Sequence, residues 1–104
     1  MDMDITDAEK LDEIIKDKAV VLFYADWCPY CAAFKPIFDS YNIDGFQLVK
    51  VKINEDDNPL WDRFDIMAIP TVIAFKDGKI ISRRDAKSVG LSKSDMDSLV
   101  KELN

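Results

Sequence analysis

The amino-acid sequence predicts a single α/β domain over residues 1–104. Along the chain, apolar residues switch between continuous or alternating runs, which are typical of strands, and three- to four-residue spacing, which is typical of helices. The predicted order of elements is β-α-β-α-β-α-β-β-α. A chain of 104 residues suits one hydrophobic core. The three glycines all fall in predicted turns, so the local and global signals agree.

The first part of the chain predicts a strand, a helix and a second strand. Residues 3–5 are predicted to form a short edge strand. Thr6 and Glu9 make a capping-box pattern, and the apolar spacing that follows predicts a helix ending near Lys16. The continuous apolar run 19–25 is rich in β-branched and aromatic residues, which favours a strand buried on both faces.

A second helix is predicted to begin within the sequence Trp27-Cys28-Pro29-Tyr30-Cys31. Pro29 suits the first turn, where its missing N–H has no intrahelical partner to lose. Pro36 lies inside the predicted helix and is expected to kink it. The apolar face of this helix is predicted to consist of Phe34, Ile37, Phe38 and Tyr41.

A turn, a strand and a short helix are expected next. Asp44-Gly45 marks the turn, and alternating apolar residues over 49–53 predict the strand. Asn58 is predicted as the N-cap of the helix, Pro59 as its first residue and Phe64 as its approximate end.

The last part of the chain predicts a hairpin and a terminal helix. A buried strand over 71–75 is followed by the turn signal Asp77-Gly78 and by a returning antiparallel strand over 79–84. Ser92 is predicted to cap the last helix. The apolar stripe of that helix is Met96, Leu99, Val100 and Leu103.

Composition and charge argue against several classes of partner. The net charge is −6, and the only adjacent basic pair, Arg83-Arg84, is followed by Asp85, so no nucleic acid is expected to bind. No apolar run is long enough to span a membrane. The opening residues 1–4 are acidic, whereas a signal peptide carries Lys or Arg there. We therefore expect a cytoplasmic monomer without membrane or nucleic-acid partners.

Two cysteines separated by two residues are the main functional signal in a chain that contains no histidine. Cys28 is predicted at the N-cap and Cys31 at the third helical position, which places both sulfurs on one side of the first turn. The free N–H groups and the positive end of the helix dipole stabilise a thiolate, the nucleophilic form of cysteine. A disulfide closing so short a loop contributes little stability, so reactivity explains the pair better.

This placement predicts thiol–disulfide exchange. The Cys28 thiolate would attack a substrate disulfide, and Cys31 would then attack Cys28 and release the reduced substrate. Cys28 takes the attacking role because the N-cap sulfur faces outward, whereas its own helix turn shields Cys31. One alternative is that the two cysteines supply half of the ligands of a metal site. Because the chain has no His and no third Cys, such a site would need a dimer, or an iron–sulfur cluster completed by outside thiols. Inert buried cysteines are another alternative.

The chain resembles the thioredoxin family over essentially its whole length. Residues 27–31 are similar to the active site of that family, and Ile69-Pro70-Thr71 is similar to its cis-proline loop. Further similarities are Pro36, Lys52-Ile53-Asn54 and Val89-Gly90. The resemblance implies the thioredoxin fold, a central mixed sheet of four to five strands flanked by helices on both faces. It also implies a protein dithiol–disulfide oxidoreductase that uses a Cys28–Cys31 disulfide and no metal or other cofactor.

The resemblance also assigns roles to residues and partners to the protein. Cys28 would be the attacking thiol and Cys31 the resolving thiol. Pro70 would be cis and would pack against the disulfide, while the backbone of Ile69 would pair with an extended substrate segment. Protein disulfides would be the substrates, and a reductase of the thioredoxin-reductase type or glutathione would be the electron donor. The apolar docking patch would consist of Trp27, Pro29, Tyr30, Ile69 and Gly90.

Two departures from the thioredoxin pattern affect these expectations. Pro29-Tyr30 is typical of glutaredoxins, so a glutathione-coupled enzyme is an alternative, although the Thr-Val-Pro and Gly-Gly motifs of glutaredoxins are absent. Leu22 stands where thioredoxins bury an aspartate, and Asp26 and Lys52 are the nearby charges expected to tune the site. Because a buried carboxylate raises neighbouring thiol pKa values, Leu22 predicts a more acidic Cys28 and a more oxidising couple than in a typical thioredoxin.

Overall fold

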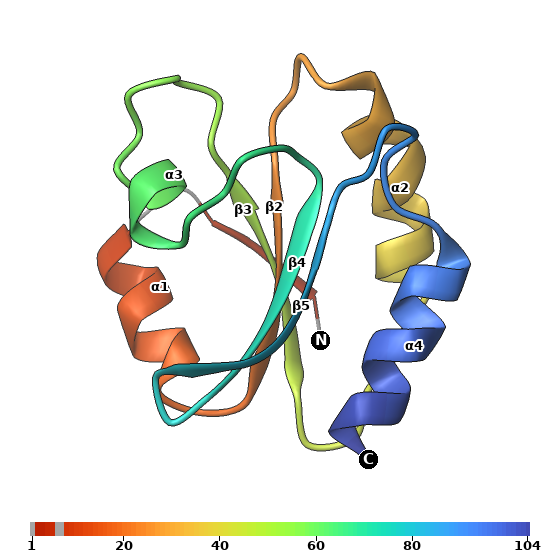
Figure 1. Ribbon diagram of the computed structural model, residues 1–104. Coiled ribbons are helices and arrows are strands. Elements are labelled where there is room, and N and C mark those ends of the chain that lie inside the picture. Colours follow the sequence, from red (N-terminus) through yellow and green to blue (C-terminus); the bar gives the residue numbers. More distant parts are fainter. Residues whose placement is uncertain (1, 6–7) are drawn as a thin grey trace.

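The fold is built on a mixed β-sheet (Figure 1). The computed structural model describes residues 2–5 and 8–104. Within these ranges, five strands form one sheet in the order β1-β3-β2-β4-β5. Strands β1 and β2 run parallel to β3, whereas β4 is antiparallel to both β2 and β5. The elements are β1 (Asp2–Ile5), α1 (Ala8–Ile15), β2 (Ala19–Tyr24), α2 (Pro29–Asp39), β3 (Gln47–Lys52), α3 (Leu60–Arg63), β4 (Thr71–Lys76), β5 (Lys79–Asp85) and α4 (Lys93–Leu103).

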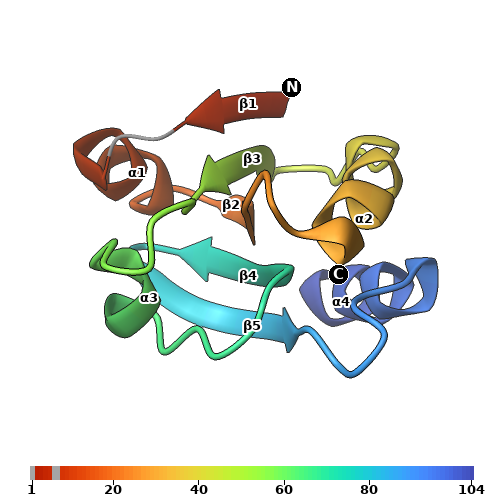
Figure 2. The same cartoon turned by 90° about the horizontal axis from the view of Figure 1, so that it is seen from above.

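Helices cover both faces of the sheet, as Figures 1 and 2 show. Successive side chains of a strand point to opposite faces, so β2 contributes to two cores. Val20 and Leu22 pack with α2 and α4, whereas Val21 and Phe23 pack with α1 and α3. All six residues of β2 are buried, which confirms the prediction of a strand covered on both sides.

One edge of the sheet collects the segments that carry the predicted site residues. Because β2 and β3 are parallel and β4 runs against them, the ends of β2 and β3 and the start of β4 lie together at the top of Figure 1. The N–H of Ile53 donates to the carbonyl of Tyr24 at 2.8 Å, which holds the two strand ends side by side. Helix α2 begins at this same edge.

One residue that was predicted on the apolar face of the second helix lies outside the helix. Helix α2 ends at Asp39, and Tyr41 lies beyond it. Ser40 stops the helix because its N–H and its hydroxyl both donate to the carbonyl of Ile37. Tyr41 still packs partly against the core, and its hydroxyl donates to Asp97 of α4. The helix continues through Pro36; the expected kink there stays a prediction.

The start of the third helix also differs from the prediction. Pro59, not Asn58, is the N-cap, and the first helical residue is Leu60. Asn58 nevertheless serves this end of the helix, since its side-chain oxygen accepts the N–H of Leu60 at 2.9 Å. Five further elements stop one residue from their predicted ends: α1 at Ile15, β2 at Tyr24, β3 at Lys52, β4 at Lys76 and β5 at Asp85. Strand β3 also begins at Gln47, two residues before its predicted start.

Two local signals are confirmed by the backbone. Asp77 and Gly78 have φ values of 56° and 80°, the left-handed pair that a two-residue hairpin turn of the predicted kind requires. Ser92 caps α4 in a capping box with Asp95. The first capping-box pattern includes Thr6, which lies outside the described residues.

Candidate active site

Cys28 and Cys31 form a disulfide at the start of α2, with their Cα atoms 5.2 Å apart. Cys28 is the N-cap in an extended conformation, and its sulfur accepts the N–H of Cys31 at 3.1 Å. Pro29 occupies the first turn, where no hydrogen bond is lost. Cys28 is 6% exposed, whereas Cys31 is completely buried. Cys28 is therefore the more accessible of the two cysteines.

The loop before β4 lies across the disulfide. The Ile69–Pro70 peptide bond is cis, as the resemblance implied. The Sγ of Cys28 is 3.7 Å from the carbonyl oxygen of Ile69, although 41 residues separate them in sequence. Thr71 donates its hydroxyl to the carbonyl of Ala68 at 2.7 Å and so closes the turn around Pro70.

The predicted charges Asp26 and Lys52 form an ion pair of 3.1 Å beside the site. Asn54 joins them, because its side-chain oxygen accepts the N–H of Asp26 at 2.8 Å and its amide donates to the Asp26 carboxylate at 3.0 Å. The hydrogen bond from Asn54, followed by that from Lys52, lowers the pKa of Asp26 below its usual value of 3.8. Asp26 is therefore an anion at neutral pH.

Asn54 also orients the tryptophan next to the cysteines. The indole Nε1 of Trp27 donates to the Asn54 carbonyl at 2.8 Å, which fixes the ring at the edge of the sheet. In the sequence, Asn54 stands out only as part of a family pattern, and no role was predicted for it. Its position directly after a strand that ends beside β2 is the signal from which that role could have been found.

An exposed apolar surface surrounds the disulfide. Trp27 is 56% exposed and Tyr30 is 49% exposed. Gly90 has a φ of +82°, and a Cβ built on it would lie 3.0 Å from the Cβ of Tyr30, so the loop before α4 packs directly against the start of α2. Met67 and Val89, which the sequence prediction did not include, are 87% and 74% exposed in the two flanking loops.

The interior beneath the disulfide is apolar. Leu22 is completely buried in the same cluster as both cysteines, together with Phe34 of α2 and Val72 of β4. No group of three or more His, Cys, Asp or Glu residues that could hold a metal ion occurs in the described ranges. No helix within residues 2–5 and 8–104 is long and apolar enough to cross a membrane.

Known proteins share this arrangement. A family model described as thioredoxin matches residues 3–102. A thioredoxin of Rickettsia bellii is 36% identical over 108 aligned positions, covering 100% of this chain and 97% of the relative. One of Mycoplasmoides gallisepticum is 39% identical over 83 positions, covering 77% and 83%.

A solved structure agrees with these relatives. The reduced thioredoxin pre-protein of Schistosoma mansoni superimposes with a TM-score of 0.74 at 27% identity, covering 99% of this chain and 98% of that one. The iron–sulfur and glutaredoxin-like alternatives are not favoured by any of these similarities. The chain thus belongs to the thioredoxin family, whose members are protein thiol–disulfide oxidoreductases that carry their redox-active disulfide in the protein itself.

Proposed function

We propose that this protein reduces disulfides of other proteins in the cytoplasm, with Cys28 as the attacking thiol and Cys31 as the resolving thiol. The observation that carries the proposal is the position of Cys28, an N-cap sulfur that accepts a backbone N–H beside the cis-proline loop. That hydrogen bond and the helix dipole both favour a thiolate at Cys28 once the disulfide is reduced.

The exchange proceeds in two steps. The Cys28 thiolate attacks one sulfur of the substrate disulfide, forms a mixed disulfide and releases the other substrate sulfur as a thiolate. The substrate thiolate released in the first step takes the proton of Cys31, and Cys31 then attacks Cys28, which releases the second substrate sulfur as a thiolate. Two electrons pass to the substrate, and the Cys28–Cys31 disulfide remains. A donor of the thioredoxin-reductase type would return two electrons to it; glutathione is the competing donor.

The proposed docking surface consists of backbone and apolar side chains on three segments. A substrate segment in extended form would pair with the backbone at Ile69, next to cis Pro70. Trp27 and Tyr30 are the large exposed rings at its border, while Gly90 leaves the space that Tyr30 fills. Pro29 adds an exposed apolar ring in the first turn of α2. Asp26 and Lys52 would tune the electrostatic potential around this surface.

The cysteine roles are tested with single substitutions. We expect Cys28→Ser to abolish the reduction of insulin disulfides in the presence of dithiothreitol. Cys31→Ser should instead accumulate a mixed disulfide with insulin through Cys28, visible by mass spectrometry without reductant. Insulin reduction by the Cys28→Ser protein at the wild-type rate would show that the roles are assigned wrongly. Comparing a purified thioredoxin reductase with glutathione as donors would identify the source of electrons.

A further inference from the structure

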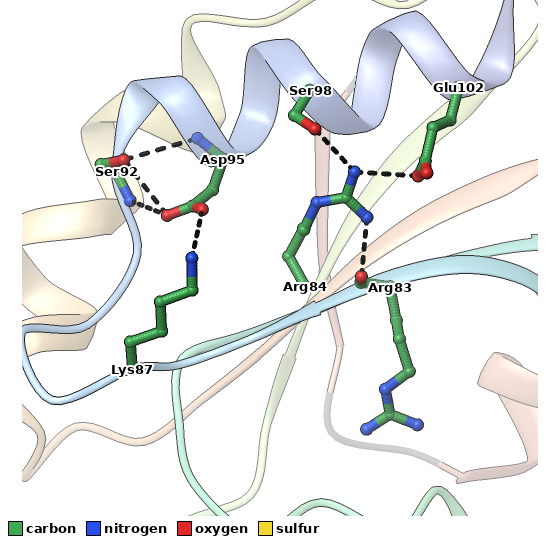
Figure 3. Close-up of polar contacts among 7 residues, drawn as sticks. All are labelled: Arg83, Arg84, Lys87, Ser92, Asp95, Ser98 and Glu102. Carbon is green, nitrogen blue, oxygen red and sulfur yellow. Dashed lines mark hydrogen bonds and ion pairs between the residues drawn. The ribbon is translucent and has the colours of Figure 1, made fainter.

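Strand β5 carries two adjacent arginines that serve opposite faces of the sheet. In the β4–β5 register, Arg84 pairs with Val72 and Arg83 pairs with Ile73. Val72 belongs to the core under α2 and α4, whereas Ile73 belongs to the core under α1 and α3. Because paired residues of neighbouring strands lie on the same face, the two guanidinium groups are directed to different helical layers. Figure 3 shows Arg84 reaching α4 and Arg83 pointing away from it.

Arg84 ties the strand to the last helix. Its guanidinium donates to the hydroxyl of Ser98 at 2.8 Å and pairs with Glu102 at 2.9 Å (Figure 3). These contacts lie on α4, along the part of the helix that packs over β5. Arg84 therefore has a structural partner on the α4 side and contacts nothing near the cis-proline loop among the interactions that the structure describes.

Arg83 instead binds the backbone at the end of α3. Its Nη1 donates to the carbonyl of Phe64 at 2.9 Å, and its Nη2 donates to the carbonyl of Asp65 at 3.4 Å. The Asp85 carboxylate accepts from Nε at 3.0 Å and lies 2.9 Å from Nη2, which fixes the orientation of the guanidinium plane. The planar guanidinium carries its donors in a fixed fork and holds two carbonyls and a carboxylate in a set orientation, whereas an ammonium has three donors that rotate freely.

The turn that Arg83 holds has an unusual residue in it. The N–H of Ile66 donates to the carbonyl of Trp61 at 2.8 Å and the N–H of Asp65 donates to that of Asp62 at 3.2 Å, the two bonds of a Schellman motif. Asp65 occupies the left-handed position with a φ of +53°, where glycine is usual. The left-handed conformation is unfavourable for a residue that has a side chain, so this turn benefits from an added restraint.

The same turn leads directly into the substrate-facing loop. Ile66 is buried and anchors the segment, Met67 is exposed, and Ile69 brings its carbonyl to the Sγ of Cys28. We propose that Arg83, oriented by Asp85, is a positioning residue that fixes segment 66–69 for the binding of a substrate backbone. This inference rests on the proposed function, since it assigns Arg83 to the proposed docking surface and not to the chemistry of the cysteines.

The test compares two disulfides that differ in their need for the docking surface. Insulin offers a peptide backbone next to its disulfides, whereas 2-hydroxyethyl disulfide offers none. For Arg83→Met we expect the second-order rate of insulin reduction to fall about three- to ten-fold, the order expected for losing the net contribution of one hydrogen bond. The rate with 2-hydroxyethyl disulfide and the reduction potential of the Cys28–Cys31 couple should stay at their wild-type values. Arg83→Lys should recover part of the insulin rate.

Arg84→Met is the matched control, because it removes the same charge from the neighbouring residue of the same strand. It should leave the ratio of the two rates unchanged. An equal loss with both disulfides, no loss with insulin, or the same ratio in both arginine variants would overturn the proposal. If Arg83→Met does not fold, Asp85→Asn, which keeps Arg83 but removes its orienting charge, should lower the insulin rate selectively. A wild-type protein that reduces neither disulfide would instead contradict the proposed function.

Discussion

Leu22 determines what kind of interior lies behind the two sulfurs. It is completely buried in the cluster that contains Cys28 and Cys31. A carboxylate at this position would be desolvated and would oppose a second negative charge on a nearby thiolate. With an aliphatic side chain there, the hydrogen bond from the Cys31 N–H and the helix dipole act on Cys28 without that opposition. The sequence-based prediction of an acidic Cys28 thiol therefore has a structural basis, although it stays a prediction.

Leu22→Asp tests this effect of the apolar interior. We expect the substitution to raise the pKa of the Cys28 thiol by about one unit, or about 1.4 kcal/mol. The Cys28–Cys31 couple should become more reducing by on the order of 30 mV, because a less stable thiolate disfavours the reduced form. Thiol alkylation rates against pH and equilibration with glutathione buffers measure the two quantities.

Leu22→Asn is the matched control for Leu22→Asp. It introduces a polar group of the same size without the charge, so it should cost about 1–3 kcal/mol of unfolding free energy without raising the thiol pKa. A wild-type Cys28 pKa near the free value of about 8.5, or identical pKa values in the two variants, would contradict the argument.

At the scale of elements, the site depends on how closely α2 and the loop before α4 approach. Gly90 permits that approach in two ways, since its φ is +82° and a Cβ on it would meet Tyr30 at 3.0 Å. Gly78 in the β4–β5 hairpin has nearly the same φ, +80°, but a Cβ there meets nothing within 4 Å. Comparing alanine substitutions at the two glycines therefore separates the free-energy cost of the backbone conformation from the cost of displacing Tyr30.

Gly90→Ala and Gly78→Ala use this difference. Both should lose about 1 kcal/mol of unfolding free energy, because alanine resists a positive φ. Gly90→Ala should lose roughly 1–3 kcal/mol more through overpacking, and it should reduce insulin more slowly because Tyr30 moves. Guanidinium denaturation of the oxidised proteins measures the difference. Equal stability losses in the two variants would show that Tyr30 yields without strain.

Some elements of the site could be predicted from sequence and others could not. The positions of Cys28, Pro29 and Cys31 on the helix follow from local rules, and the structure confirms the N-cap. Asn54 and Arg83 were not predicted, because each acts through a hydrogen bond with a residue far away in the sequence: the Asn54 carbonyl accepts from Trp27, and Arg83 donates to the carbonyl of Phe64. Periodicity identifies which face of an element is apolar, but it does not show which polar side chain reaches a distant turn.

At the scale of the whole molecule, the order of the elements could be predicted because the apolar pattern of each segment agrees with the faces that the element buries in the fold. The run 19–25 predicted a strand covered on both faces, and the two cores on either side of β2 confirm it. Ends of elements were less predictable: Ser40 and Pro59 end or begin helices through hydrogen bonds that leave no periodic signal. The cis bond before Pro70 followed only from the resemblance to thioredoxins, since few Xaa–Pro bonds are cis.

The ion pairs of the surface link the stability of the whole fold to pH. Hydrogen bonds from Tyr41 and Lys93 lower the pKa of Asp97, and those from Ser82 and Arg84 lower the pKa of Glu102. Carboxylates with a lowered folded-state pKa stabilise the fold fully above their unfolded values of 3.8 and 4.5. That contribution disappears as the pH falls through the lower folded-state pKa, when each carboxylate takes up a proton.

At high pH the effect has the opposite sign and involves Tyr41 and Lys93, the two residues that contact Asp97 of α4. Burial, followed by the hydrogen bond to Asp97, raises the pKa of Tyr41 above 10.0, and the hydrogen bond to Asp97 raises that of Lys93 above 10.5. Groups with a raised pKa stabilise the fold fully below their unfolded values, and this contribution is lost as the pH rises through the folded ones. The stability of the fold should therefore be highest between about pH 5 and 9 and decline on both sides.

Asp97 contributes to the pH dependence of stability on both the acid and the base side, so Asp97→Asn should weaken that dependence on both sides. We expect the denaturation midpoint of the oxidised wild-type protein to fall below about pH 4 and above about pH 10. In Asp97→Asn both slopes should be shallower, because the variant has no carboxylate to protonate and no anion to hold Tyr41 and Lys93 in their protonated forms. Asp44→Asn, at an exposed turn before β3, is the control for the change in net charge and should keep both slopes. Parallel curves for wild type and Asp97→Asn would show that the bridge between Tyr41 and α4 does not contribute to the pH dependence of folding.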